Sequence, residues 1–168
     1  VPMDRVFNIG SPLFEILGHY REKIQRSDVV ERLGLREGQF FVLSCHREEN
    51  VDNPAHLRNL VEALNALAKK YRFPLIFSVH PRTQKRLGAA RHKLHPLVRT
   101  MPPLGFFDYV ALQKNAFCTL SDSGTITEES SLLGFPAITA RQAHERPEGM
   151  DEGVLIMSGL TKDRILQA

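Results

Sequence analysis

The sequence alternates between short apolar runs and longer segments in which apolar residues recur every three or four positions. The clearest helical period runs from Pro54 to Tyr71, directly after Asp52 and Asn53, and predicts a helix with one apolar face. Other helices are expected at 13–20, 82–93, 107–115 and 125–133, and from residue 161 onward. Strands are expected at 39–45, 74–80, 117–120, 136–139 and 154–157, with a weaker one at 97–101. Strand and helix therefore alternate about six times along the chain.

This alternation predicts an α/β fold, a Rossmann-like parallel sheet with helices on both faces. The chain has 168 residues, of which 42% are hydrophobic, and it shows no internal repeat or linker, so residues 1–168 are expected to form a single domain. In such folds ligands bind outside the carboxyl ends of the strands. The first polar residues after each strand are therefore the candidates for a functional site.

The composition of the chain limits the class of protein to which it can belong. No apolar run has the roughly 20 residues that a membrane span needs, and the first residues lack the pattern of a signal peptide, so a soluble cytoplasmic protein is expected. Cys45 and Cys118 lie inside apolar runs and are expected to be buried thiols, with no disulfide, metal or cofactor.

The charge balance of the chain is only mildly basic, with 22 Lys and Arg against 19 Asp and Glu. Its densest basic stretch, from Arg82 to Lys93, could be a nucleic-acid patch. Its apolar residues recur at helical spacing, however, and no aromatic residue lies between the charges. A solvated helix face is favoured, and no nucleic-acid partner is expected.

A cluster of small polar residues, Ser123, Gly124 and Thr125, stands between the strand at 117–120 and the helix at 125–133. Backbone N–H groups at the start of a helix attract anions, and glycine permits an anion to approach closely, so phosphate is the expected ligand. Glu128 and Glu129 follow in the first turn, where they could merely stabilise the helix. A carboxylate also accepts hydrogen bonds from the hydroxyls of a ribose, and this combination indicates a nucleotide.

Two further side chains follow neighbouring strands. Arg146 suits a bidentate grip on phosphate, although it could simply pair with Glu145 or Glu148. His46 could transfer a proton, although a histidine at this place is more often a structural residue.

Several common catalytic motifs are excluded. Ser123 lacks the flanking glycines of a nucleophile elbow, because Ser121 and Thr125 stand in their places. The glycine-rich fingerprints of NAD-binding and ATP-binding loops are also absent from the sequence.

Five segments carry most of the candidate chemistry, and they span about two-thirds of the chain. They are CHREEN (45–50), VHPRT (79–83), PLGFFDYVALQKNAF (103–117), SDSGTITEES (121–130) and HERPEGMDEG (144–153). In order and spacing these segments resemble the C-terminal half of the non-hydrolysing UDP-N-acetylglucosamine 2-epimerases. The resemblance implies the C-terminal Rossmann-like half of a glycosyltransferase-B architecture, with the active site in a cleft between two domains.

The resemblance also implies roles for the phosphate and ribose candidates. Residues 123–125 would form the diphosphate-binding helix start, Glu129 would hold the ribose and Arg146 would bind phosphate. The sequence departs from many members at Thr125 and Thr127, where Gly and Gln are usual, and this departure bears on which sugar is accepted. The amino-acid sequences SDSGTITEE (121–129) and HERPEGMDEG (144–153) resemble those of the branch that epimerises 6-deoxy UDP-sugars on the way to UDP-N-acetylfucosamine for surface polysaccharides.

His46 matches the family's active-site histidine, next to the bond between sugar and diphosphate. Tyr109, and less closely Phe106, matches positions at which members of the family have residues around the uracil. The family eliminates UDP and re-adds it, with catalytic carboxylates supplied by an N-terminal domain. This resemblance therefore implies a UDP-sugar substrate, a partner domain that this chain lacks, a fragment that is inactive alone, and a homodimeric complete enzyme.

Two other functions remain open at this point. The chain could be the nucleotide-binding half of a glycosyltransferase, which would share the architecture and the diphosphate site. It could also be a UDP-sugar-binding module without catalysis.

Overall fold

The computed structural model of the chain describes residues 2, 5, 7, 10–89, 93–141 and 155–168. Among these residues, no helix is both long enough and apolar enough to span a membrane.

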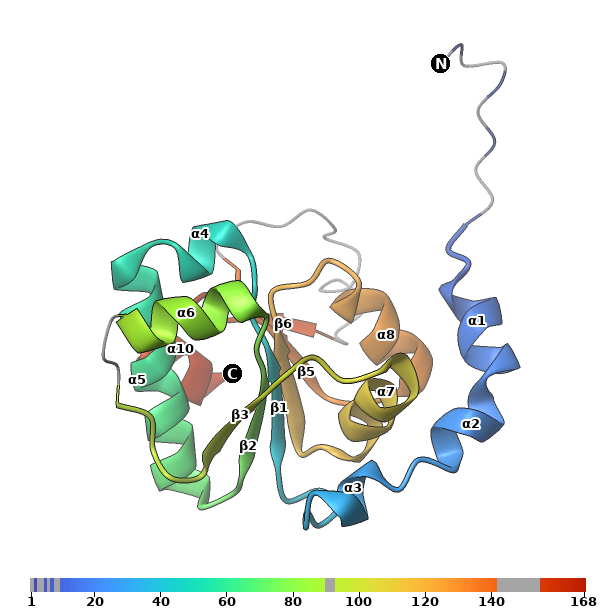
Figure 1. Ribbon diagram of the computed structural model, residues 1–168. Coiled ribbons are helices and arrows are strands. Elements are labelled where there is room, and N and C mark those ends of the chain that lie inside the picture. Colours follow the sequence, from blue (N-terminus) through green and yellow to red (C-terminus); the bar gives the residue numbers. More distant parts are fainter. Residues whose placement is uncertain (1, 3–4, 6, 8–9, 90–92, 142–154) are drawn as a thin grey trace.

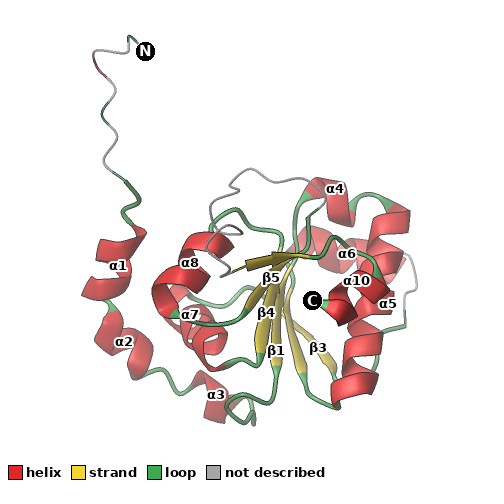
Figure 2. Ribbon diagram, turned by 180° about the vertical axis from the view of Figure 1, so that it is seen from behind, coloured by secondary structure: helices red, strands yellow, loops and turns green. Residues whose placement is uncertain are grey.

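The described residues are built around one parallel sheet, which confirms the expected Rossmann-like fold (Figure 2). Its strands are β1 (Phe41–Ser44), β2 (Leu75–Ser78), β3 (Val98–Met101), β4 (Cys118–Ser121), β5 (Ala137–Thr139) and β6 (Leu155–Met157). They lie in the order β3-β2-β1-β4-β5-β6, and every neighbouring pair is parallel. The strand order therefore reverses between β1 and β4, which is the place where such sheets bind ligands.

Helices cover both faces of this sheet, as Figure 1 shows. One face carries α5 (Pro54–Tyr71), α6 (Pro81–Ala89) and α10 (Lys162–Gln167). The other carries α1 (Leu13–His19), α2 (Arg21–Gln25), α3 (Val29–Arg32), α7 (Phe106–Asn115) and α8 (Ile126–Leu133). A short helix, α4 (Glu48–Val51), follows β1.

The central strands are apolar at consecutive positions because both of their faces are buried. Phe41 and Leu43 of β1 pack into the cluster with α5, whereas Val42 packs into the cluster with α7. Neighbouring side chains of a strand point to opposite faces, so a strand between two helical layers needs apolar residues throughout.

The helix expected at 13–20 is confirmed as α1. Two further short helices, α2 and α3, follow it and were not expected from the sequence, and the chain bends around α7 along them. Tyr20 lies between α1 and α2, and its ring lies 5.2 Å from that of Phe107. Ser27, just before α3, donates a hydrogen bond of 2.6 Å to Asp108. These contacts with α7 define the path of the segment.

The start of α5 rests on a specific side-chain cap. The Oδ1 atom of Asn53 accepts hydrogen bonds from the N–H groups of Ala55, at 2.9 Å, and His56, at 3.3 Å. Pro54 occupies the first helical position, where its missing N–H costs nothing.

We expect Asn53→Ala to lower the free energy of unfolding by about 1 kcal/mol, because two N–H groups lose their acceptor. Glu62→Ala, at an exposed position of the same helix, is the matched control and should change it by less than about 0.5 kcal/mol. Urea unfolding followed by circular dichroism measures both. Equal stability of the two variants would contradict the assigned cap.

Candidate functional site

Most of the residues expected to form a site lie around the carboxyl ends of β1 and β4. His46 follows β1, and residues 123–125 follow β4, which is the direct neighbour of β1 in the sheet. Glu129 lies in the first turns of α8, and Tyr109 lies on α7. Arg146 lies outside the described residues.

The carboxyl group of Asp122 joins the two loops. It is fully buried, and it accepts hydrogen bonds from the backbone N–H groups of His46, at 3.0 Å, and Arg47, at 2.9 Å. The amide of Asn50, in α4, donates to the same carboxyl oxygen at 2.9 Å. A buried polar group is stable only when its hydrogen bonds are satisfied, so this one side chain fixes the path of the chain after β1.

The thiol of Cys45 belongs to the same buried cluster. Its Sγ atom donates to Asp122 Oδ2 at 3.1 Å. Burial raises the pKa of this thiol well above its usual range, and the negative charge of Asp122 adds to the effect. Cys45 is therefore a buried, protonated donor, which agrees with the expectation from the sequence.

The loop before α8 is held by its own hydroxyl groups. The N–H group of Ser123 donates to Ser121 Oγ at 3.1 Å, and that of Thr125 donates to Ser123 Oγ at 3.3 Å. Within the described part of the chain, the N–H group of Gly124 has no such acceptor. Gly124 is therefore the backbone donor of this loop that remains available to an anion.

The two glutamates of α8 have different neighbours. Glu129 accepts hydrogen bonds of 2.7 Å from the Thr125 hydroxyl and from the Gln113 amide. Glu128 accepts a hydrogen bond from Ser11, which lies before α1. Glu129 thus connects the loop at 123–125 to α7 through hydrogen bonds.

Tyr109 lies in the wall of the same region. Its ring packs against the apolar cluster beneath α7, and the pKa of its phenol is raised well above the usual range, chiefly because it is largely removed from water. The hydroxyl of Ser44, at the end of β1, acts in the opposite direction, and the charges of Glu129 and Asp122 raise the pKa further.

A charged cluster holds α4 against α6. Arg82 donates to Glu48 at 2.5 Å and also to Asp52, and Arg86 donates to Asp52 at 3.2 Å. The hydrogen bond from Arg82 is the main reason why the pKa of Asp52 lies below its usual range. These side chains are partly exposed, so the cluster positions α4 more than it stabilises the fold.

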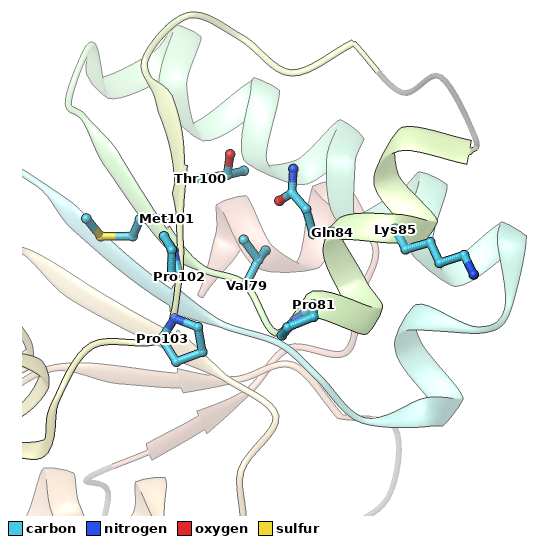
Figure 3. A pocket seen from close by; sticks show the side chains of 8 residues that line it. All are labelled: Val79, Pro81, Gln84, Lys85, Thr100, Met101, Pro102 and Pro103. Atoms are coloured by element: carbon cyan, nitrogen blue, oxygen red, sulfur yellow. The ribbon is translucent and has the colours of Figure 1, made fainter.

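A separate cavity of about 530 Å³ opens beside the ends of β2 and β3 (Figure 3). Val79, Met101 and three prolines form much of its lining, and Gln84, Lys85 and Thr100 are its polar members. Of the described residues, none that was expected to bind the substrate or to act in catalysis lines this cavity.

Two side chains that support the candidate site were not predicted from the sequence. Asp122 is part of the SDSGT motif, but only the structure places its carboxyl group beneath the His46 loop. Gln113 is fully buried, and its Nε2 atom donates to Glu129. The one feature of the sequence that could have indicated Gln113 is that a polar amide stands among the regularly spaced apolar residues of a predicted helix.

The arrangement combines three chemical groups at one edge of the sheet. A helix start with an available N–H group suits an anion, a half-buried carboxylate one turn further suits hydroxyl groups, and an exposed imidazole follows the neighbouring strand.

The chain resembles one group of known proteins. The family model for UDP-N-acetylglucosamine 2-epimerase matches residues 1–168. A UDP-N-acetylglucosamine 2-epimerase of Methanocaldococcus jannaschii is 38% identical over 136 residues, which are 79% of this chain and 37% of that protein.

Solved structures agree with this match. The UDP-N-acetylglucosamine 2-epimerase from Rickettsia bellii has 46% identity and a TM-score of 0.80, over 95% of this chain and 42% of that one. The M. jannaschii UDP-GlcNAc 2-epimerase in complex with UDP-GlcNAc and UDP has 31% identity and a TM-score of 0.88, over 99% of this chain and 48% of that one. The chain spans less than half the length of these relatives, and it belongs to the UDP-N-acetylglucosamine 2-epimerase family.

Proposed function

We propose that the protein binds the nucleotide of a UDP-N-acetylhexosamine and forms the nucleotide-binding half of a 2-epimerase. The substrate would be UDP-GlcNAc, converted to UDP-ManNAc, or a 6-deoxy analogue used for surface polysaccharides. The observation that carries the proposal is the position of Glu129, Gly124 and His46 at the switch point between β1 and β4. Family membership supports the same ligand.

The proposed pose follows from the spacing of these groups. The diphosphate would lie at Ser123, Gly124 and Thr125, where an N–H group and the positive end of α8 favour negative charge. The ribose hydroxyls would donate to Glu129, whose carboxylate is already aligned by Thr125 and Gln113. The uracil would lie near Tyr109 and α7.

Two parts of the proposal concern groups beyond the described residues. Arg146 would supply the cation that a diphosphate requires, because a guanidinium binds phosphate oxygens in a bidentate way. A preceding domain would supply the carboxylates that move the proton at C2, which agrees with the length of the relatives, more than twice that of the matched part. The complete enzyme would then be a homodimer in which His46 lies beside the leaving diphosphate.

In an enzyme of the relatives' full length, Glu129→Ala should weaken UDP binding. The ribose hydroxyls lose a charged acceptor, which is worth about 1.5–3 kcal/mol, or roughly a 10- to 100-fold change in Kd. Glu128→Ala is the matched control, because that carboxylate contacts Ser11 instead of the proposed ribose site. Its Kd should change by less than about threefold. Calorimetric titration with UDP gives both values, and the reverse order would disprove the assigned helix register.

The 168-residue chain itself should bind UDP, weakly, through the same contacts. Arg146→Ala should weaken this binding further, because the diphosphate loses its cation. Arg58→Ala removes the same charge from an exposed position on α5 and should leave the affinity unchanged. Absence of any heat at millimolar UDP, with the three proteins indistinguishable, would rule out the proposed phosphate site.

A further inference from the structure

The position of Asp122 relative to the imidazole of His46 has a chemical consequence. Besides accepting the His46 backbone N–H, Asp122 places its Oδ1 atom 3.5 Å from His46 Nδ1. The carboxyl group is fully buried, whereas 53% of the His46 side chain is exposed. One ring nitrogen thus faces a fixed acceptor inside the protein, and the other lies on the side of the ring further from it.

We propose that Asp122 is the positioning residue of His46, and that it holds the neutral imidazole in the tautomer with its proton on Nδ1. A carboxylate beside one ring nitrogen of a histidine favours the proton on that nitrogen, and here Asp122 Oδ1 lies 3.5 Å from Nδ1, an ion-pair contact that a small turn of the exposed ring converts into a hydrogen bond. Free histidine in water favours the proton on Nε2. The carboxyl group reverses this preference and leaves the Nε2 lone pair directed to the open side of the loop.

The surroundings of Asp122 make this arrangement rigid. Its two oxygens are held by the N–H groups of His46 and Arg47, by the Asn50 amide and by the Cys45 thiol. Asn50 also donates to the carbonyl oxygen of Ala140, at 3.2 Å, so the carboxyl group cannot rotate without breaking several contacts. A fixed acceptor favours one ring orientation of His46 and one protonated nitrogen.

The proposed tautomer assigns a separate role to each ring nitrogen of His46, and this assignment of roles rests on the proposed function. Nε2 becomes the nitrogen that exchanges a proton with a bound ligand, and Nδ1 becomes the anchor. The tautomer itself is a property of the protein without ligand. It can therefore be measured independently of UDP binding and of epimerase activity.

The test is a two-bond ¹H–¹⁵N correlation spectrum of the ¹⁵N-labelled chain without ligand, at about pH 9, where an ordinary imidazole is neutral. The chain has seven histidines, and the signals absent from His46→Gln identify His46. The expected spectrum shows the proton of His46 on Nδ1, and a proton on Nε2 would overturn the proposal.

Asp122→Ala tests whether the carboxyl group is the cause. A folded variant should show His46 with its proton returned to Nε2, and retention of the proton on Nδ1 would overturn the assignment to Asp122. Glu129→Ala, which removes another carboxyl group of the same region, should keep the proton on Nδ1. If Asp122→Ala fails to fold because buried donors lose their acceptor, the spectrum of the parent chain still tests the proposal. A proton on Nδ1 of His46 supports it, and a proton on Nε2 overturns it.

Discussion

The buried carboxyl group of Asp122 is the constraint on which the whole candidate site depends. It stands at the end of β4 and accepts hydrogen bonds from the backbone of the loop after β1. The strands alone would bring these two loops close together, since β1 and β4 are neighbours in the sheet. The hydrogen bonds to the carboxyl group fix the position of one loop relative to the other. A small error in such a position is costly for catalysis.

The rest of the site is built outward from this point in two directions. Along β4, the chain continues into the loop at 123–125 and α8, where Gln113 and Thr125 align Glu129. Along β1, it continues through His46 into α4, which the Asn50 amide anchors from inside and Arg82 holds from outside. The groups proposed to bind phosphate and ribose therefore share a rigid support with the imidazole, as precise positioning requires.

The sequence predicted the fold well because its pattern is strong where packing is simple. The helix at 54–71 has a long regular period, and the central strands are apolar on both faces, so both were confirmed with bounds that differ by at most a few residues. The helix expected at 13–20 was also confirmed, as α1, but α2 and α3 were not predicted. Their positions depend on contacts with Phe107 and Asp108 of α7, which no local period encodes.

The candidate site was predicted in its motifs but not in its supports. The motifs show where polar residues follow strands, and these positions place His46 and Glu129 on the same edge of the sheet. Burial of Asp122 and of Gln113 arises only when distant segments pack together, so neither could be assigned from spacing. Arg146 remains a prediction from sequence and resemblance.

The most direct test of the proposed nucleotide site is a crystal structure of this chain with UDP bound. The proposed site requires diphosphate oxygens within hydrogen-bond distance of the Gly124 N–H group and ribose hydroxyls on the carboxylate of Glu129. A UDP molecule that is bound elsewhere, or with its ribose away from Glu129, would contradict it.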